Sequence, residues 1–110
     1  MNNSSENTNY FVTISIDAQA FFESSPASLQ KKLDRCFAIL KVSPCNYPNI
    51  KALKGSLSGY YRYRVGDYRV IYEVNDDLHQ VTIILIALLL DFKNAIAFFT
   101  GECEVLCQTF

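Results

Sequence analysis

The sequence predicts a small α+β protein with a single domain, and three observations lead to this class. The chain has 110 residues, a length typical of one domain with one hydrophobic core. A segment of alternating apolar and polar residues is followed by two stretches with helical periodicity, and further alternating segments separated by tight-turn residues come after them. Half of the residues are hydrophobic and 19% are charged, a balance that argues against a disordered chain.

The first part of the chain is predicted to form one strand and two helices. Residues 10–16 alternate as a half-buried strand does. Asp17 is expected to cap a short helix over residues 18–24, and Ser25, which precedes a proline, is expected to cap a second helix that ends near Lys41. The apolar stripe of this second helix consists of Leu29, Leu33, Cys36, Phe37 and Leu40.

The middle of the chain is predicted to form an antiparallel meander of three strands. The strands are expected over residues 60–65, 68–74 and 79–87, joined by the turns Gly-Asp and Asn-Asp-Asp. The apolar run at residues 81–90 is too short to cross a bilayer. We therefore expect it to form a buried strand and expect no membrane partner.

Basic residues are concentrated in the middle of a chain whose net charge is only −1. Residues 31–69 hold nine of the ten lysines and arginines against Asp34 and Asp67, so this segment carries a charge of +7. Such segregation indicates a local basic surface on a nearly neutral protein. A solvated charged face without a ligand is the alternative interpretation.

The geometry of the predicted hairpin gathers three arginines. A two-residue turn places Arg64 directly opposite Arg69, and alternation along the strand puts Arg62 on the same face. Like charges in such a pair destabilise a sheet by up to about 1 kcal/mol. The cluster therefore indicates an anionic ligand, and Lys51 and Lys54 are expected to extend the patch. In the alternative, Glu73 or the acidic end of the chain neutralises the arginines.

A phosphodiester is the anion that best matches this patch. The planar guanidinium group binds phosphate with two parallel hydrogen bonds. RNA can be cleaved when its own 2′-hydroxyl attacks the adjacent phosphate, and arginines orient that phosphate and stabilise the developing charge. Proton transfer would fall to a lysine or a tyrosine, because arginine is too basic.

Cofactor and metal chemistry is not expected. Cys103 and Cys107 are four residues apart, but a zinc site would need two more ligands, and His79 is the only histidine. No signal peptide is visible, so we expect reduced cysteines and a cytoplasmic protein.

Two motifs are similar to those of a known protein family. LKG at residues 53–55 and GYYRYRVGDYRVIY at residues 59–72 resemble the RelE/ParE superfamily, the toxins of type II toxin–antitoxin systems, which include plasmid stabilisation modules. The resemblance covers residues 10–87. It implies helices packed on a twisted antiparallel sheet, and a cognate antitoxin as the partner.

The resemblance also implies roles for individual residues. RelE-type members are mRNA endonucleases that often act in the ribosomal A site. Arg62, Arg64 and Arg69 match the catalytic positions that bind and polarise the scissile phosphate, and Lys54 matches a basic position that contributes to RNA binding. The implied partners are thus the antitoxin, mRNA and the ribosome, with no cofactor.

The sequence departs from the family pattern after Ala87. A basic pair and a tyrosine are expected there, but Leu88, Leu89 and Leu90 are followed by Asp91. Residues 1–9 are predicted to be disordered, and residues 88–110 to form a divergent segment, for which a frameshift in the gene is one hypothesis. Three functions stay open: an mRNA endoribonuclease, a gyrase-inhibiting toxin without nuclease activity, and a decayed toxin that only binds its antitoxin.

Overall fold

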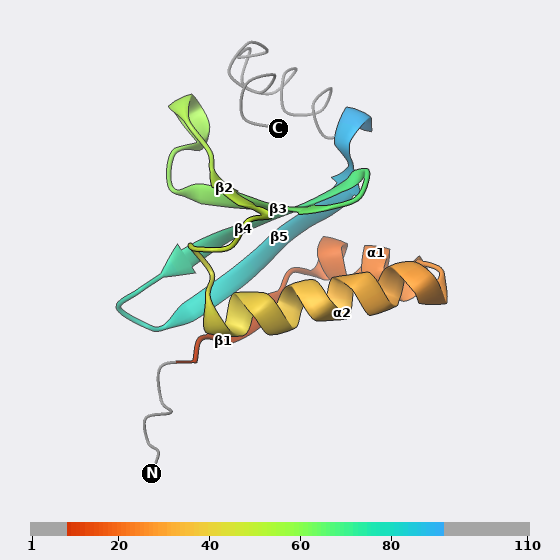
Figure 1. Ribbon diagram of the computed structural model, residues 1–110, viewed down its shortest axis with the longest axis horizontal. Coiled ribbons are helices and arrows are strands. Elements are labelled where there is room, and N and C mark those ends of the chain that lie inside the picture. The colour runs from red at the N-terminus through yellow and green to blue at the C-terminus, as the bar shows by residue number, and fades with distance from the viewer. Residues whose placement is uncertain (1–8, 92–110) are drawn as a thin grey trace.

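Residues 9–91 are described by the computed structural model (Figure 1). The predictions for residues 1–9 and 88–110 therefore fall almost entirely outside the described residues. The elements, in chain order, are β1 (Phe11–Ile14), α1 (Ile16–Ser24), α2 (Ala27–Val42), β2 (Ile50–Ala52), the short 3-10 helix η2 (Gly55–Leu57), β3 (Tyr60–Val65), β4 (Tyr68–Asn75) and β5 (Gln80–Leu88).

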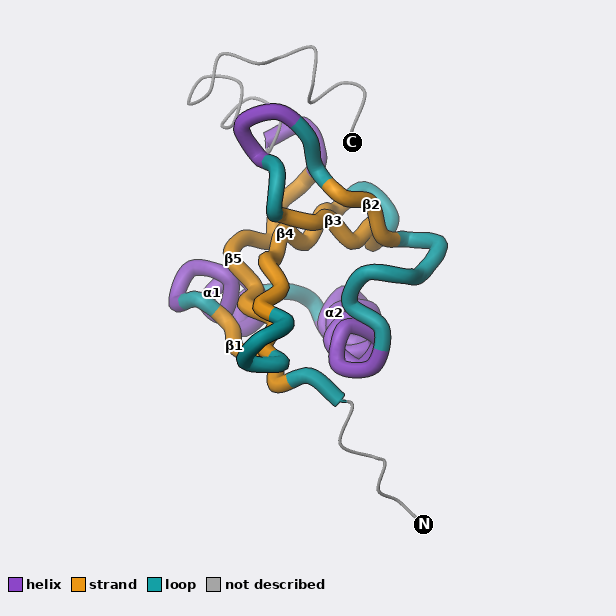
Figure 2. The backbone as a smooth tube through the Cα atoms, turned by 90° about the vertical axis from the view of Figure 1, so that its left-hand side faces the viewer, coloured by secondary structure: helices purple, strands orange, loops and turns teal. Residues whose placement is uncertain are grey.

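A five-stranded sheet of order β1-β5-β4-β3-β2 forms the middle of the molecule. Both α-helices lie against one face of the sheet, while η2 and its flanking loops rise on the other side (Figures 1 and 2). The α+β class predicted from the sequence is confirmed. None of the helices in the described part of the chain is long and apolar enough to cross a membrane.

The meander has the predicted strands and register. Arg64 pairs with Arg69 and Val65 pairs with Tyr68 across the β3–β4 turn. Gly66 adopts a φ of 57°, a left-handed conformation that a tight hairpin turn requires. The third predicted strand begins one residue late, because His79 itself adopts a φ of 54° and belongs to the preceding turn.

The sheet is mixed, because β1 joins it next to β5 in a parallel pair. The meander strands are antiparallel as expected. The N-terminal strand instead takes the open edge of β5, and it enters at the His79 end of that strand, where Phe11 N–H donates to the His79 carbonyl at 2.8 Å. The parallel direction of β1 beside β5 follows from the end at which β1 enters the sheet. The local sequence of β1 does not specify that end.

Both predicted helix caps are wrong in detail. Ser15 caps α1 in place of Asp17, because its hydroxyl accepts the Ala18 N–H at 3.1 Å, and the first strand therefore ends at Ile14. Ser25 does not cap α2. Its hydroxyl donates to the Phe21 carbonyl at 2.7 Å and so satisfies the end of α1.

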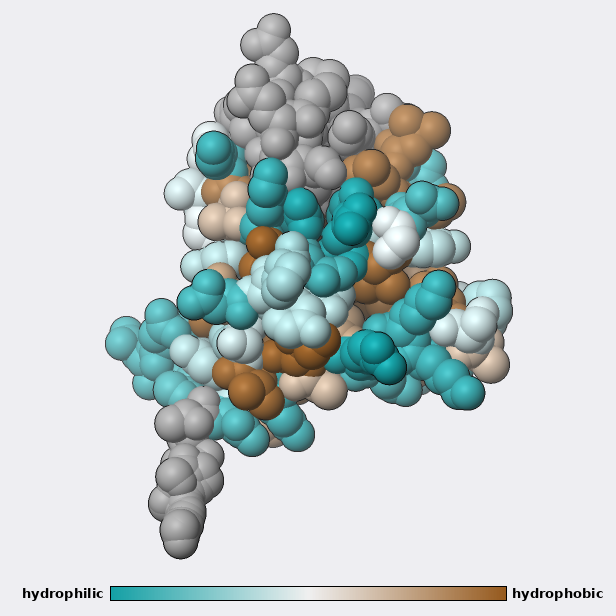
Figure 3. Space-filling view, viewed as in Figure 1, coloured by the Kyte–Doolittle hydropathy of each residue, from teal (hydrophilic) through white to brown (hydrophobic). Residues whose placement is uncertain are grey.

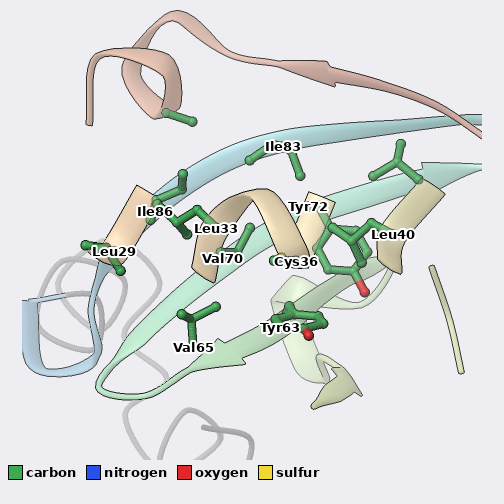
Figure 4. Packing of buried hydrophobic residues seen from close by; sticks show 12 residues of the cluster. Leu29, Leu33, Cys36, Leu40, Tyr63, Val65, Val70, Tyr72, Ile83 and Ile86 are labelled. Atoms are coloured by element: carbon green, nitrogen blue, oxygen red, sulfur yellow. The ribbon is translucent and has the colours of Figure 1, made fainter. Parts of the chain in front are cut away.

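The core lies between α2 and the covered face of the sheet (Figure 4). The predicted helical stripe points into it, and Leu33, Cys36 and Leu40 are fully buried. Facing them are side chains from three strands: Tyr63, Val65, Val70, Tyr72, Ile83 and Ile86. Burial of this apolar area holds α2 on the sheet, which leaves the opposite side chains of β3 and β4 on the other face.

Candidate functional site

Three arginines lie on the sheet face that the helices leave uncovered. Arg62 and Arg64 alternate with core residues of β3, and Arg69 does the same on β4. Arg62 pairs with Ile71, which belongs to a second, smaller apolar cluster away from the main core. The structure thus places the three residues as predicted, and we call this surface, with Lys51, the arginine face.

The three arginines differ in their exposure to solvent. Arg64 is exposed, whereas only 8% of the surface of Arg62 and 5% of that of Arg69 is accessible to solvent. Arg64 is therefore the most accessible of the three guanidinium groups. The other two contribute mainly through their positive charge, which low-polarity surroundings screen weakly.

Arg62 is held by the loop that leads into β2. Its Nη1 donates to the main-chain carbonyl of Asn49, while its buried Nε has no hydrogen-bond partner among residues 9–91. Burial, reinforced by the charge of Arg64, lowers the pKa of Arg62. The fold therefore carries this cation at an electrostatic cost, and no carboxylate of residues 9–91 pairs with it.

Arg69 is held by its own hairpin. Its Nη1 donates to the carbonyls of Gly66 and Tyr68, each at 2.9 Å. Burial, followed by the charges of Arg62 and Arg64, lowers the pKa of Arg69, and Asp67 opposes this effect only weakly. The mutual influence of the three side chains shows that their charges act on one small region.

The two lysines of the predicted patch take different positions. Lys51 on β2 pairs with Arg62, so it lies on the arginine face at the edge of the sheet, where it is exposed. Lys54 precedes η2 and is also exposed. The structure thus joins Lys51 to the arginines through a strand that sequence reasoning missed, and it shows no contact between Lys54 and them.

Neutralisation by Glu73 is not observed. Glu73 pairs with Tyr60 at the far end of the hairpin, where it lines a hollow with Asn75, Asp76 and Asp77. Within residues 9–91 neither Arg62 nor Arg64 forms an ion pair with a carboxylate. The acidic residues near the C-terminus lie outside the described residues.

Apolar side chains form the floor beside the arginines. Leu53 and Ile71 are buried there, and Leu57, Tyr60, Leu85 and Ala87 pack against them. Space-filling Figure 3 shows hydrophilic and hydrophobic areas side by side on one side of the molecule. Weak dielectric screening next to such apolar atoms strengthens the attraction between the guanidinium groups and a bound anion.

Asn49 is the residue that sequence reasoning missed. Its side-chain Nδ2 donates to the Arg64 carbonyl at 2.8 Å, and its own carbonyl accepts the Arg64 N–H at 3.0 Å as well as the Arg62 guanidinium. Asn49 therefore fixes the edge of β3 and the side chain of Arg62 together. Its place after a proline in an irregular loop offers no periodicity that could have revealed it.

No metal centre is present in the described part of the chain. It contains no group of three or more His, Cys, Asp or Glu side chains able to hold an ion. His79 stacks on Tyr10, with ring centroids 4.2 Å apart. Cys103 and Cys107 lie outside the described residues.

A protein-family model matches most of the chain. The model describes the ParE toxin of the type II toxin–antitoxin system parDE, and it covers residues 15–88. These bounds include both helices and all strands except β1. No match was found among curated proteins.

Solved structures of toxins share the fold. The RelE–RelB complex from the archaeon Pyrococcus horikoshii is 28% identical, with 73% of this chain and 94% of the other aligned at a TM-score of 0.65. The YoeB/ParE toxin from Agrobacterium tumefaciens is 18% identical, with coverages of 71% and 96% and a TM-score of 0.64. The E. coli RelBE toxin–antitoxin complex is 18% identical, with coverages of 72% and 95% and a TM-score of 0.61.

Proposed function

Since the chain belongs to the RelE/ParE superfamily of type II toxin–antitoxin toxins, we propose that it binds mRNA on the arginine face and cleaves it as an endoribonuclease. The observation that carries this proposal is the pairing of Arg64 with Arg69, with Arg62 on the same face. In a toxin that bound no anion on this face, like charges placed opposite each other would only destabilise the sheet.

The geometry supports a role for each arginine. Exposed Arg64 is able to bind the scissile phosphate with two parallel hydrogen bonds. Buried Arg62 and Arg69 are held by main-chain carbonyls, so they keep their positions while negative charge develops on the phosphate. Lys51, and Lys54 before η2, would bind neighbouring phosphates of the strand.

The proposed reaction is an internal transfer within the RNA. The 2′-oxygen attacks the adjacent phosphorus and loses its proton, the bond from phosphorus to the 5′-oxygen breaks, and that oxygen gains a proton. The products are a 2′,3′-cyclic phosphate and a free 5′-hydroxyl. On the described part of the arginine face, Lys51 and Tyr60 carry groups able to exchange these protons.

A cognate antitoxin is the expected protein partner. Several solved relatives are toxin–antitoxin complexes, among them the one from Pyrococcus horikoshii. A partner that placed carboxylates on the arginine face would pair with Arg62 and Arg64 and keep RNA away. We propose this surface as the site of neutralisation.

The direct test adds the purified toxin to translating ribosomes and maps the 5′ ends of the mRNA. Defined new ends are expected with the wild type, and far fewer with Arg64→Ala. Lys41→Ala is the matched control, since Lys41 is an exposed base on α2 that lines a different hollow with Phe11 and Phe37. Intact message at high dose would refute the nuclease.

Inhibition of DNA gyrase is the second candidate, and the match to the ParE family model favours it. This function needs no cleavage chemistry, which agrees with the three leucines at residues 88–90 where a basic pair is expected. A supercoiling assay with purified gyrase separates the two functions. Loss of supercoiling together with intact mRNA would establish the second candidate.

A further inference from the structure

A second basic surface lies between α2 and the β3–β4 hairpin. It is a groove of about 440 Å³. Lys31, Lys32 and Arg35 line it from α2, and Arg64 lines it from β3. The three α2 residues lie outside the apolar stripe of the helix, and the sequence does not show that the fold brings them to Arg64.

The cations of this groove are not neutralised within the described part of the chain. Lys31, Lys32, Arg35 and Arg64 are exposed, and none of them forms an ion pair with a carboxylate of residues 9–91. Asp34 is a neighbour on the same helix and makes no such pair. Four like charges around one hollow repel one another, and a bound anion would relieve that repulsion.

Arg64 belongs to both basic surfaces. Its side chain lies on the arginine face by strand alternation, and at the edge of the sheet it also lines the groove. The pairing of β2 with β3 ends at Tyr63, and among the described residues the next main-chain neighbour of β3 on that side is Asn49, whose carbonyl accepts the Arg64 N–H. A flexible polyanion can therefore pass from one surface to the other at this point.

We propose that the groove binds further phosphates of the same RNA strand whose scissile phosphate lies on the arginine face. This inference rests on the proposed function and adds a subsite to it. The strand would run across Arg64 and then along the basic side of α2. Contacts of this kind supply affinity and register, and they do not depend on base sequence.

The chemistry of the groove favours a nucleic acid over an acidic peptide. Its apolar lining residues, Tyr63 and Val65, are only 5% and 7% exposed. Protein partners are usually anchored by large apolar or aromatic side chains in desolvated pockets, and this groove offers them little apolar surface. A chain of phosphates needs only cations placed along its path.

The test measures binding of a 12-nucleotide 2′-O-methyl RNA, which lacks the attacking hydroxyl, as a function of salt. Lys32→Gln removes one charge of the groove, and Lys41→Gln removes one from the same helix outside it. Lys51→Gln reports on the arginine face separately. Thermal unfolding of each variant checks that it is folded.

We expect Lys32→Gln to flatten the log–log salt dependence by about 0.7, the value for one phosphate contact to a single strand. The triple variant K31Q/K32Q/R35Q should flatten it further, and Lys41→Gln should leave it unchanged. A 2′-O-methyl dinucleotide, whose single phosphate would be held at the arginine face, should bind wild type and triple variant equally. These results together would support the subsite.

Other outcomes identify which proposal fails. If the triple variant binds RNA as the wild type does and Lys51→Gln binds it more weakly, the groove is not a phosphate subsite, and the proposed function is unaffected. If the triple variant loses affinity for the antitoxin and still binds RNA as the wild type does, the groove binds a protein, and the subsite proposal is overturned. Unchanged binding by Lys51→Gln and Arg64→Ala, with loss in the triple variant, would overturn the arginine face as the RNA site.

Discussion

Arg64 and Arg69 stand directly opposite each other in the β3–β4 ladder, and Arg62 lies on the same face of the sheet. Two of these guanidinium groups are buried with a lowered pKa. The fold therefore holds an arrangement that its own stability does not favour. Such an arrangement is expected at a site that a ligand completes, where stability and function oppose each other.

Replacement of Arg64 by threonine should stabilise the free protein. The change removes one charge of the opposed pair, and we expect the free energy of unfolding to rise by up to about 1 kcal/mol. Urea denaturation measures it. Arg64→Lys keeps the charge and should behave like the wild type, so equal gains in both variants would show that charge repulsion is not the cause.

Replacement of Arg62 by methionine should also stabilise the free protein while it weakens RNA binding. Burial disfavours the charge of Arg62, and an apolar chain of similar length would pack against buried Ile71 and Leu53. The Asn49 carbonyl keeps its bond from the Arg64 N–H. We expect a gain of about 1 kcal/mol by urea denaturation. A large loss would mean that the Arg62–Asn49 contact holds the loop in place.

Sequence reasoning succeeded where a short-range rule determines the geometry. The two-residue turn at Gly66 fixed which residues face each other, so the pairing of Arg64 with Arg69 followed from counting. The buried stripe of α2 followed in the same way from its periodicity. Both patterns depend only on residues close together along the chain.

Prediction from the sequence failed where segments far apart along the chain contact each other. β2 has three residues and no alternation long enough to detect, and the parallel entry of β1 depends on a contact with His79. The groove depends on the packing of α2 against β3, and the contact of Asn49 with the Arg62 side chain is made by a main-chain carbonyl. Local composition does not encode the burial of Arg62 and Arg69 either, because that burial follows from neighbours on other strands.

Removal of the Tyr72 hydroxyl should weaken the fold without changing RNA binding. Tyr72 is fully buried, and its hydroxyl donates to the Pro44 carbonyl at 2.6 Å. Tyr72→Phe leaves that carbonyl unsatisfied, at a cost of about 1–3 kcal/mol in the free energy of unfolding. Urea denaturation and RNA titration on the same sample check both parts. A loss of RNA binding at temperatures where the variant is folded would contradict the prediction.

The stability of the protein should fall at alkaline pH because of Cys36. Burial raises the pKa of the Cys36 thiol far above its ordinary value, so the folded protein keeps this proton while the unfolded chain releases it above about pH 9. The contribution of Cys36 is fully present below pH 9 and is lost as the pH rises. Near pH 9.5 this loss amounts to about 1 kcal/mol per pH unit.

Two cysteine variants isolate this effect. Cys36→Ala should lower the free energy of unfolding at neutral pH, because it leaves a small cavity, and should flatten its decline between pH 9 and 10. Cys45 is an exposed free thiol, so Cys45→Ala should keep the wild-type decline. Above about pH 10 the decline should persist in all three proteins, since burial also raises the pKa of Tyr72 far above its ordinary value. An equal slope in Cys36→Ala and wild type between pH 9 and 10 would show that the Cys36 thiol ionises in the folded state.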